Sequence, residues 1–238
     1  MVLAEFYCFG ISHFSAIFVI ILLCYAVPRW MKNEKSELKK TRIRYVLGSL
    51  LIFAVLMDPV IIFNRWGMGE TGWALFWSSA LPLYLCDVVS LVAAHALFTK
   101  STHTTEITYC WGLAGTTQGL LTPTLSYDWN TVDYYNFFLQ HGGVPVAACL
   151  LVWGMGILPE KGAFRRVVYW SWIYIAVIIL INLGIQQNYG FLNGKPNYPT
   201  MFDYMGPYPY YLITLQAMAF GLYYVLLRVA PKDVRDIQ

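Results

Sequence analysis

The sequence is poor in charge, and this deficit bounds the class of protein. Only 12% of its 238 residues are Asp, Glu, Lys or Arg, whereas 58% are hydrophobic and 17% are aromatic. The mean hydropathy is +0.52, while a soluble domain usually carries about 25% charged residues. An ordinary soluble domain is therefore excluded, and we expect an integral membrane protein.

Several common motifs are missing as well. The five cysteines show neither C-x-x-C nor metal-ligand spacing, so no disulfide framework and no metal site are predicted. No nucleotide-binding loop, internal repeat or low-complexity segment is visible, and we predict a single domain, residues 1–238. The N-terminal segment lacks a basic n-region and a small-residue cleavage site, so we expect it to be retained as a span.

Long apolar runs dominate what is present. Windows of about 19 residues identify seven segments long enough to cross a bilayer as helices, and transmembrane strands would instead read as about ten alternating residues. The predicted fold class is an all-α membrane protein, a bundle of seven transmembrane helices. The predicted spans are 6–27, 45–63, 80–98, 107–125, 135–156, 167–187 and 209–227.

The cationic residues predict the orientation. Of the 16 Lys and Arg residues, 14 fall in alternate connections and the C-terminal tail, seven of them in segment 28–44, whereas only Arg65 and Lys195 fall on the opposite side. The positive-inside rule therefore predicts the N-terminus outside and the C-terminus in the cytoplasm. Segment 28–44 could also bind nucleic acid or lipid phosphates, but basic cytoplasmic loops are usual, and we expect no nucleic-acid partner.

The most informative stretch is 81–90, which places Cys86 beside Asp87 inside an apolar span. An ionisable side chain in a span indicates a functional site, since its burial in hydrocarbon costs about 2.5 to 3.5 kcal/mol on insertion scales. If every span is laid out in its predicted direction, polar residues fall roughly 8 to 11 Å below the outer boundary. They are His13, Asp58, Cys86, Gln118, His141, Asn182 and Gln216.

The residue types in this polar layer indicate what it could do. A thiol is a poor nucleophile until it loses its proton, so a reactive Cys86 needs a base such as His141. Asp58 is the first candidate to orient that imidazole, with Asp87 and Asn182 behind it. Two further members, Gln118 and His13, could donate hydrogen bonds to an oxyanion.

Each of these residues also has a simpler interpretation. Cysteine in a membrane helix is usually a small inert hydrophobe, and histidine in a span more often makes a helix-helix hydrogen bond. A metal site built from His13, His141, Asp58 and Cys86 lacks any short-range ligand pattern. The aromatic outer segment 188–208 fits either an interfacial belt or a lid over a cavity.

Four motifs together carry a resemblance to a known family. They resemble, in order and over most of the chain after Trp73, the YwaF-like family of bacterial membrane proteins, which includes the animal acyltransferase transmembrane protein 164. As a set they are specific, whereas each alone is not. The motifs are LPLYLCD at 81–87, YCWGLAGTTQ with LTP at 109–123, FFLQHGG at 137–143, and GKP through MGPYPYY at 194–211.

The resemblance implies a cysteine-histidine acyltransferase that moves a fatty acyl chain from a phospholipid to a lysophospholipid through an acyl-cysteine. The family's cysteine matches Cys86 and its histidine matches His141. Such an exchange requires no soluble cofactor, its partners are the two lipids, and Lys195 could hold a headgroup phosphate. The short loops suggest a bacterial cytoplasmic membrane.

Two other functions remain open from the sequence. In a transporter or ion-coupled permease, Pro59, Pro82, Pro123 and Pro145 would mark broken helices around a midplane site, although no repeat is visible. In a non-catalytic lipid-binding or assembly protein, Cys86 would be inert.

Overall fold

The computed structural model describes residues 5–196 and 201–231. Within these residues the regular structure is helical, apart from an isolated antiparallel bridge between Glu5 and Tyr127. The α-helices are α1 (Ile11–Asn33), α2 (Glu37–Trp66), α3 (Glu70–Leu75), α4 (Leu85–Thr99), α5 (Thr102–Trp111), α6 (Thr117–Leu121), α7 (Val132–Cys149), α8 (Ala163–Ile185) and α9 (Tyr210–Val229). The remaining elements are three π-helices, η1 (Phe76–Ala80), η2 (Gly112–Thr116) and η3 (Leu150–Gly154), and two 3-10 helices, η4 (Tyr189–Phe191) and η5 (Met201–Met205).

The all-helical membrane class is confirmed, while the predicted number of seven spans is not confirmed. Five helical stretches of the described chain are long and apolar enough to cross a membrane: α1, α2, α7 with η3, α8, and α9. A bent pair, 70–80 with 85–99, raises the number to six if it crosses as one broken span. The predicted span 107–125 corresponds to α5, η2 and α6, whose many threonines and glycines make it more polar than the others.

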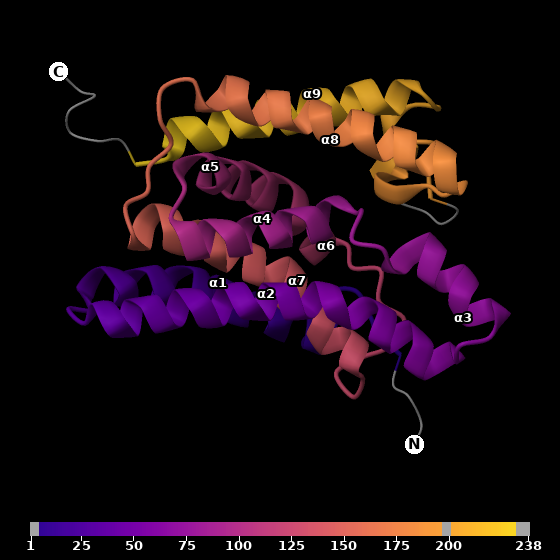
Figure 1. Ribbon diagram of the computed structural model, residues 1–238, viewed down its shortest axis with the longest axis horizontal. Coiled ribbons are helices and arrows are strands. Elements are labelled where there is room, and N and C mark those ends of the chain that lie inside the picture. The colour runs from indigo at the N-terminus through magenta and orange to yellow at the C-terminus, as the bar shows by residue number, and fades with distance from the viewer. Residues whose placement is uncertain (1–4, 197–200, 232–238) are drawn as a thin grey trace.

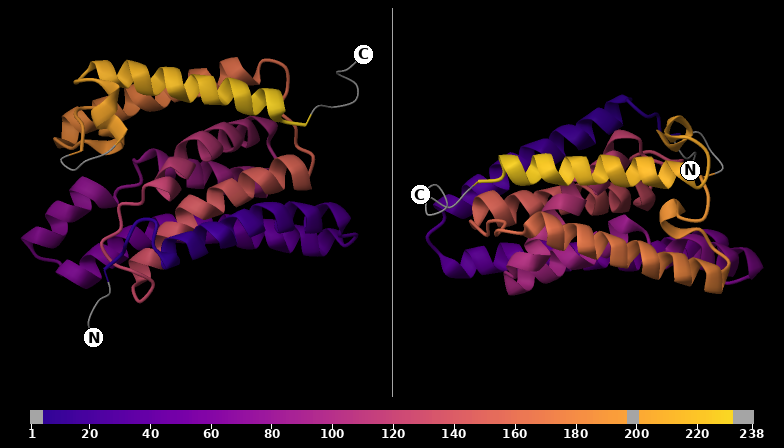
Figure 2. Two further views of the ribbon diagram at one scale, coloured as in Figure 1. Left: turned by 180° about the vertical axis from the view of Figure 1, so that it is seen from behind. Right: turned by 90° about the horizontal axis from the view of Figure 1, so that it is seen from above.

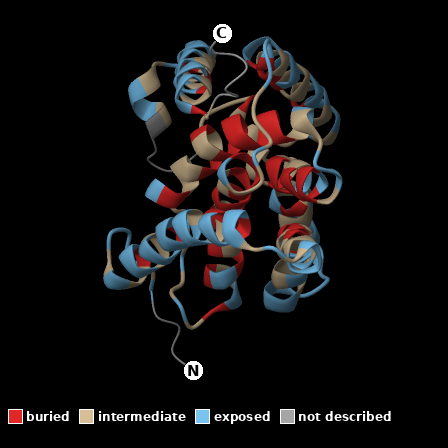
Figure 3. Ribbon diagram, turned by 90° about the vertical axis from the view of Figure 1, so that its left-hand side faces the viewer, coloured by how far each residue is buried: buried red, intermediate tan, exposed pale blue. Residues whose placement is uncertain are grey.

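The long helices run along the longest axis of the molecule in three layers (Figure 1). Helices α1 and α2 form one outer layer, α4, α5 and α7 form the middle, and α8 with α9 forms the other outer layer, as the view from behind also shows (Figure 2, left). Buried positions gather in the middle layer, and the outer helices expose much of their surface (Figure 3). Exposed apolar side chains such as Phe18, Trp172 and Val225 are those expected to face lipid.

The predicted basic loop 28–44 is mostly helix. Helix α1 continues to Asn33 and α2 begins at Glu37, so only Glu34, Lys35 and Ser36 connect them. Lys, Arg and Glu are good helix formers, and the Ser36 side chain caps α2 by accepting a hydrogen bond from the Lys39 amide at 3.4 Å. The hydropathy window therefore found the apolar part of each helix and missed its charged end.

The predicted span 80–98 is interrupted at its start. Segment 81–84 is not helical, and the chain bends by 63° between 70–80 and 85–99. Pro82 lacks an amide hydrogen and disfavours helical geometry at the preceding residue, so α4 starts only at Leu85. Helix α3 and the π-helix η1 precede the break. As a result Cys86 lies in the first turn of a helix rather than almost two turns inside it.

Two tyrosines hold this break in place. The Tyr189 hydroxyl donates to the Trp77 carbonyl at 2.9 Å and accepts from the Leu81 amide at 3.2 Å, and the Tyr174 hydroxyl donates to the Leu83 carbonyl at 2.9 Å. Tyr189 is completely buried, and burial raises the pKa of its phenol. Its hydroxyl therefore remains a hydrogen-bond donor over the physiological pH range. Through these hydrogen bonds, segment 189–192 packs against the start of α4.

Candidate functional site

A cavity of about 710 Å³ lies inside the bundle and is walled by α2, α4 to α9 and the short segments near 79, 124 and 191. Pockets for small molecules usually measure about 300 to 1,000 Å³, so this cavity is large enough for a substrate. The polar layer expected from the sequence is largely part of its wall. The expected residues that line it are Asp58, Cys86, Asp87, Gln118, His141 and Gln216.

Cys86 lies at the second position of α4, directly after the break. The first turn of a helix leaves backbone amide hydrogens without intrahelical partners, and the helix dipole places partial positive charge there. These amide hydrogens can donate to negative charge on an atom bonded to the sulfur, whereas the Asp87 carboxylate beside the thiol opposes its ionisation, so the thiol needs a base. The Cys86 side chain is partly exposed to the cavity, so a reactant can reach it.

Asp87 holds the thiol on one side. The Cys86 sulfur donates to the Asp87 Oδ1 atom at 3.9 Å, a long contact, and the Gln140 Nε2 atom donates to the same oxygen at 2.6 Å. The other carboxylate oxygen accepts from the Tyr84 amide at 3.1 Å. The carboxylate is thus fixed by α7 and by the cap of its own helix, and it orients the adjacent thiol.

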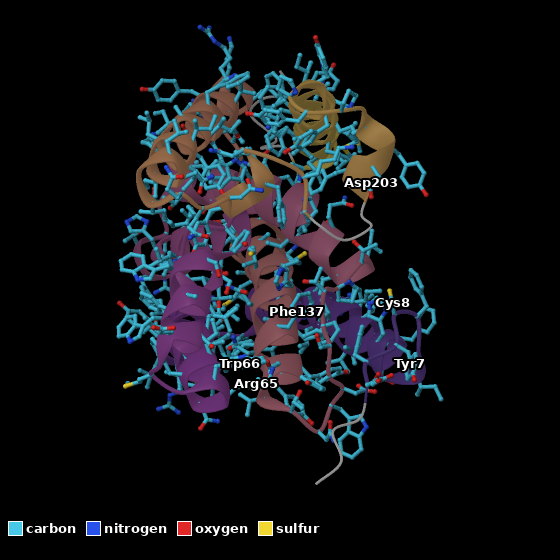
Figure 4. All side chains as sticks on the ribbon, turned by 90° about the vertical axis from the view of Figure 1, so that its right-hand side faces the viewer. Tyr7, Cys8, Arg65, Trp66, Phe137 and Asp203 are labelled. Atoms are coloured by element: carbon cyan, nitrogen blue, oxygen red, sulfur yellow. The ribbon has the colours of Figure 1, made fainter. Side chains whose placement is uncertain are left out.

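His141 is held by the preceding turn of α7. Its Nδ1 atom lies 3.1 Å from the Phe137 carbonyl oxygen, which can only accept, so Nδ1 carries a hydrogen and donates. The imidazole also stacks on the Phe137 ring, with 4.1 Å between centroids and 18° between planes. Because Nδ1 carries the hydrogen, the lone pair of the neutral ring is on Nε2, the form that a general base requires. Phe137 lies near the centre of the bundle in Figure 4, whereas Tyr7, Cys8 and Asp203 lie towards its edges.

Gly119 makes the space for this ring. A Cβ atom at Gly119 would lie 2.5 Å from the His141 Cδ2 atom and 3.0 Å from Nε2. Such distances are well inside the 3.5 to 4.0 Å at which carbon atoms rest. Helix α6 can approach the imidazole this closely only because residue 119 has no side chain.

Asp58 does not have the orienting role expected of it. The His141 Nδ1 atom contacts the Phe137 carbonyl oxygen, and this contact takes the place expected for Asp58. The Asp58 Oδ1 atom instead accepts from the Asn136 Nδ2 atom at 2.9 Å, and the same amide nitrogen donates to the Ala54 carbonyl at 3.1 Å. The carbonyl four residues earlier in the same helix serves as the hydrogen-bond acceptor for His141 Nδ1. The sequence prediction considered only side chains as partners of the imidazole. Asp58 remains a polar part of the cavity wall.

His13 and Asn182 belong to the predicted polar layer but do not line the cavity. The His13 Nδ1 atom accepts from the Phe9 amide at 2.9 Å, and Nε2 donates to the Leu120 carbonyl at 2.7 Å. Asn182 accepts from the Tyr189 amide at 2.8 Å and donates to the Tyr189 carbonyl at 2.9 Å. Both polar groups are buried and committed to backbone. These two residues therefore support the structure, and neither is available to an oxyanion or to the His141 ring.

Lys195 also lies outside the cavity wall. Its Nζ atom is 3.9 Å from an Asp203 carboxylate oxygen and 5.8 Å from the centroid of the Tyr211 ring. Its charge therefore lies in the outer aromatic segment, and its contact with a headgroup phosphate stays a prediction. That segment does reach the cavity through Phe191, Leu192, Phe202 and Met205, which fits the lid better than a belt.

Sequence reasoning did not assign a role to Asn136 or Gln140, which contact the two carboxylates of the site. Their spacing of four places them on one face of α7, and His141 follows directly. A polar stripe of this kind in an apolar span was the signal that could have identified them. In the described part of the chain, no group of three or more His, Cys, Asp or Glu side chains is arranged to hold a metal ion.

Comparison with known proteins supplies the family. Searches of curated proteins and of solved structures return no significant match. A family model, described as the TMEM164 family, matches residues 8–227, a range that contains every residue lining the cavity. On this match, the integral membrane protein built around that cavity belongs to the TMEM164 family.

Proposed function

We propose that this protein is a membrane acyltransferase that moves a fatty acyl chain between a phospholipid and a lysophospholipid through an acyl-Cys86 intermediate. One observation carries the proposal. Cys86, at the start of α4, and His141, with its Nδ1 hydrogen held by a carbonyl, line the same cavity among apolar helices. The family resemblance of both motifs supports the same roles.

The reaction has two half-reactions. In the first, the His141 Nε2 atom takes the thiol proton, and the Cys86 sulfur attacks the carbonyl carbon of the donor ester. The bond between that carbon and the ester oxygen breaks, the oxygen takes the proton from the imidazolium, and a lysophospholipid leaves. In the second half-reaction, His141 deprotonates the acceptor hydroxyl, and its oxygen attacks the thioester carbon. The carbon–sulfur bond breaks, the new ester leaves, and the Cys86 sulfur takes the proton back from the imidazolium. Acyl groups and protons balance without a cofactor.

Other parts of the cavity suit the remaining requirements. The oxyanion would meet the amide hydrogens at the start of α4 and the side-chain amides of Gln118 or Gln216, which line the cavity. The acyl chain would lie against the apolar wall. Met218 and Leu222 of α9 line the cavity and are also 43% and 39% exposed, so the lipid would enter sideways past α9.

The orientation belongs to the same proposal. The ends of α1 and α9 and the starts of α2 and α8 carry most of the cations, and they lie at the end of the bundle away from α3 (Figure 1). The positive-inside rule assigns that end to the cytoplasm. The N-terminus would then be outside, the C-terminus inside, and the cavity open to the outer leaflet, in a bacterial cytoplasmic membrane.

The direct test is to trap the intermediate. Purified protein given a phospholipid with a labelled acyl chain should carry a label that neutral hydroxylamine removes, since thioesters are cleaved under conditions that spare ordinary esters. Cys86→Ala should abolish label and transfer, and His141→Ala should slow acylation by about 10² to 10⁴. Cys110→Ala is a matched control, because Cys110 is buried outside the cavity. Acyl transfer that survives in Cys86→Ala would end the proposal, and transport of a solute by that variant would favour a permease.

A further inference from the structure

A second cavity lies at the opposite end of the bundle from α3. The last turn of α1, the first turns of α2, the end of α4 and the segment after η3 surround a space of about 240 Å³. This is smaller than the roughly 300 Å³ of the smallest usual ligand pockets, so it suits a headgroup or an inorganic ion rather than an acyl chain. Of its described lining residues, four are cationic and one is acidic: Lys32, Lys40, Arg44, Lys100 and Glu37.

Arg44 is the unusual member of this group. The residue is only 5% exposed, and its Nη1 atom is buried without a hydrogen-bond partner among the described residues. The Glu37 carboxylate does not supply that bond, since its Oε1 atom accepts from the Lys40 Nζ atom at 2.8 Å. The guanidinium carbon lies 5.9 Å from the centroid of the Tyr45 ring, and the Glu37 charge acts on the group. Neither gives Nη1 an acceptor, and buried polar atoms normally have one. The guanidinium is therefore a donor prepared for an acceptor that enters the cavity.

The positive-inside rule does not account for this arrangement. That rule concerns cations in loops that remain in water, as at the exposed Arg42 in the same helix. Arg44 is instead buried among three further cations around an open space. It lies 14 residues before Asp58 on α2, about 21 Å along a helix axis. The two cavities are thus separate sites.

We propose that this second cavity binds a phosphate-bearing anion. The Arg44 guanidinium would donate two hydrogen bonds to phosphate oxygens, the geometry for which arginine is suited, and the lysines would balance the remaining charge. The phosphate has two possible sources, an anionic lipid headgroup of the adjacent leaflet or free phosphate in solution. The site is independent of the acyl-transfer proposal, since none of its residues lines the larger cavity.

The test compares two arginines of one helix. Protein purified in a maltoside detergent, which contains no phosphate, is titrated with phosphatidylglycerol in one arm and with inorganic phosphate in the other, against chloride at equal ionic strength. Thermal unfolding and native mass spectrometry report binding. Near saturation, the bound anion should raise Tm by about 5 to 10 °C. Arg44→Gln should weaken binding at least about tenfold, whereas Arg42→Gln should leave it unchanged.

The outcomes separate the sources and the alternatives. Stabilisation by the lipid alone identifies a headgroup, and equal stabilisation by inorganic phosphate identifies a free ion. Equal losses in Arg44→Gln and Arg42→Gln, or no stabilisation in either arm, overturn the proposal. If Arg44→Gln does not fold, the double variant Lys32→Gln with Lys100→Gln keeps the guanidinium and removes two lining charges. Unchanged binding in that variant also overturns it.

Discussion

Gly119→Ala should disable the site by displacing a single ring. The new Cβ atom would lie 2.5 Å from His141 Cδ2, so one of the two groups must move by about 1 Å to reach an ordinary contact of 3.5 Å or more. The imidazole has little freedom, because it is hydrogen-bonded at 3.1 Å and stacked at 4.1 Å on Phe137. The ring must leave one of these contacts, or α6 must move away from α7.

The expected loss follows from that displacement. A misplacement of about 1 Å costs about 10²-fold in rate, and an extra methyl group in a packed interior costs about 1 to 3 kcal/mol of stability. We therefore expect acylation of Cys86 to slow about 10²-fold in Gly119→Ala, while the variant remains folded. Single-turnover acylation with labelled phospholipid measures the rate, and thermal unfolding in the same detergent measures the stability.

Gly221→Ala is the matched control. Gly221 lies on α9, where an added Cβ atom would meet no atom within 4 Å, so this variant should keep the wild-type rate. Its stability should stay equal or rise by up to about 1 kcal/mol, because alanine favours a helix over glycine. A wild-type acylation rate in Gly119→Ala would refute the argument that the position of His141 matters. Equal rate losses in both variants would show that the effect is general.

Three further predictions concern the rest of the bundle. Glu106→Ala should destabilise the fold by about 3 kcal/mol, because this carboxylate is 1% exposed and bonded to an arginine of α8 at 2.6 Å. Denaturant unfolding measures the loss, and an unchanged midpoint would contradict the prediction. Asn182→Ala should cost about 2 to 4 kcal/mol, because it leaves both backbone groups of Tyr189 unpaired, whereas Asn182→Asp should cost less. Cysteines introduced at Asn193 and Lys161 should be labelled from outside and from the cytoplasm respectively, and the reverse pattern would invert the proposed orientation.

The sequence by itself determined the class of the protein and most of the polar content of the cavity. Hydropathy is a local property, so windows of residues found the apolar helices and the few ionisable side chains inside them without any tertiary information. Five residues of the predicted polar layer line the cavity: Asp58, Cys86, Gln118, His141 and Gln216. The motif order also sufficed to identify the family.

Only the tertiary structure decided which of these residues meet. The direction of a side chain depends on how each helix is rotated about its axis and on what its neighbours offer, and neither is encoded locally. His13 and Asn182 belong to the predicted polar layer, but their side chains bond to the backbone of Leu120 and Tyr189, which lie outside their own helices. The start of α4 depends on a proline and on two tyrosine hydroxyls from elsewhere in the chain.

Arg44 is a further residue whose burial could not be predicted from the sequence. In the sequence it is one of seven cations in segment 28–44, and nothing distinguishes it from Arg42. Packing against α4 and the segment after η3 buries one guanidinium and leaves the other in solvent. The positive-inside rule assigns both arginines to the proposed cytoplasmic side, whereas burial, which depends on the neighbouring helices, distinguishes the one that lines the second cavity.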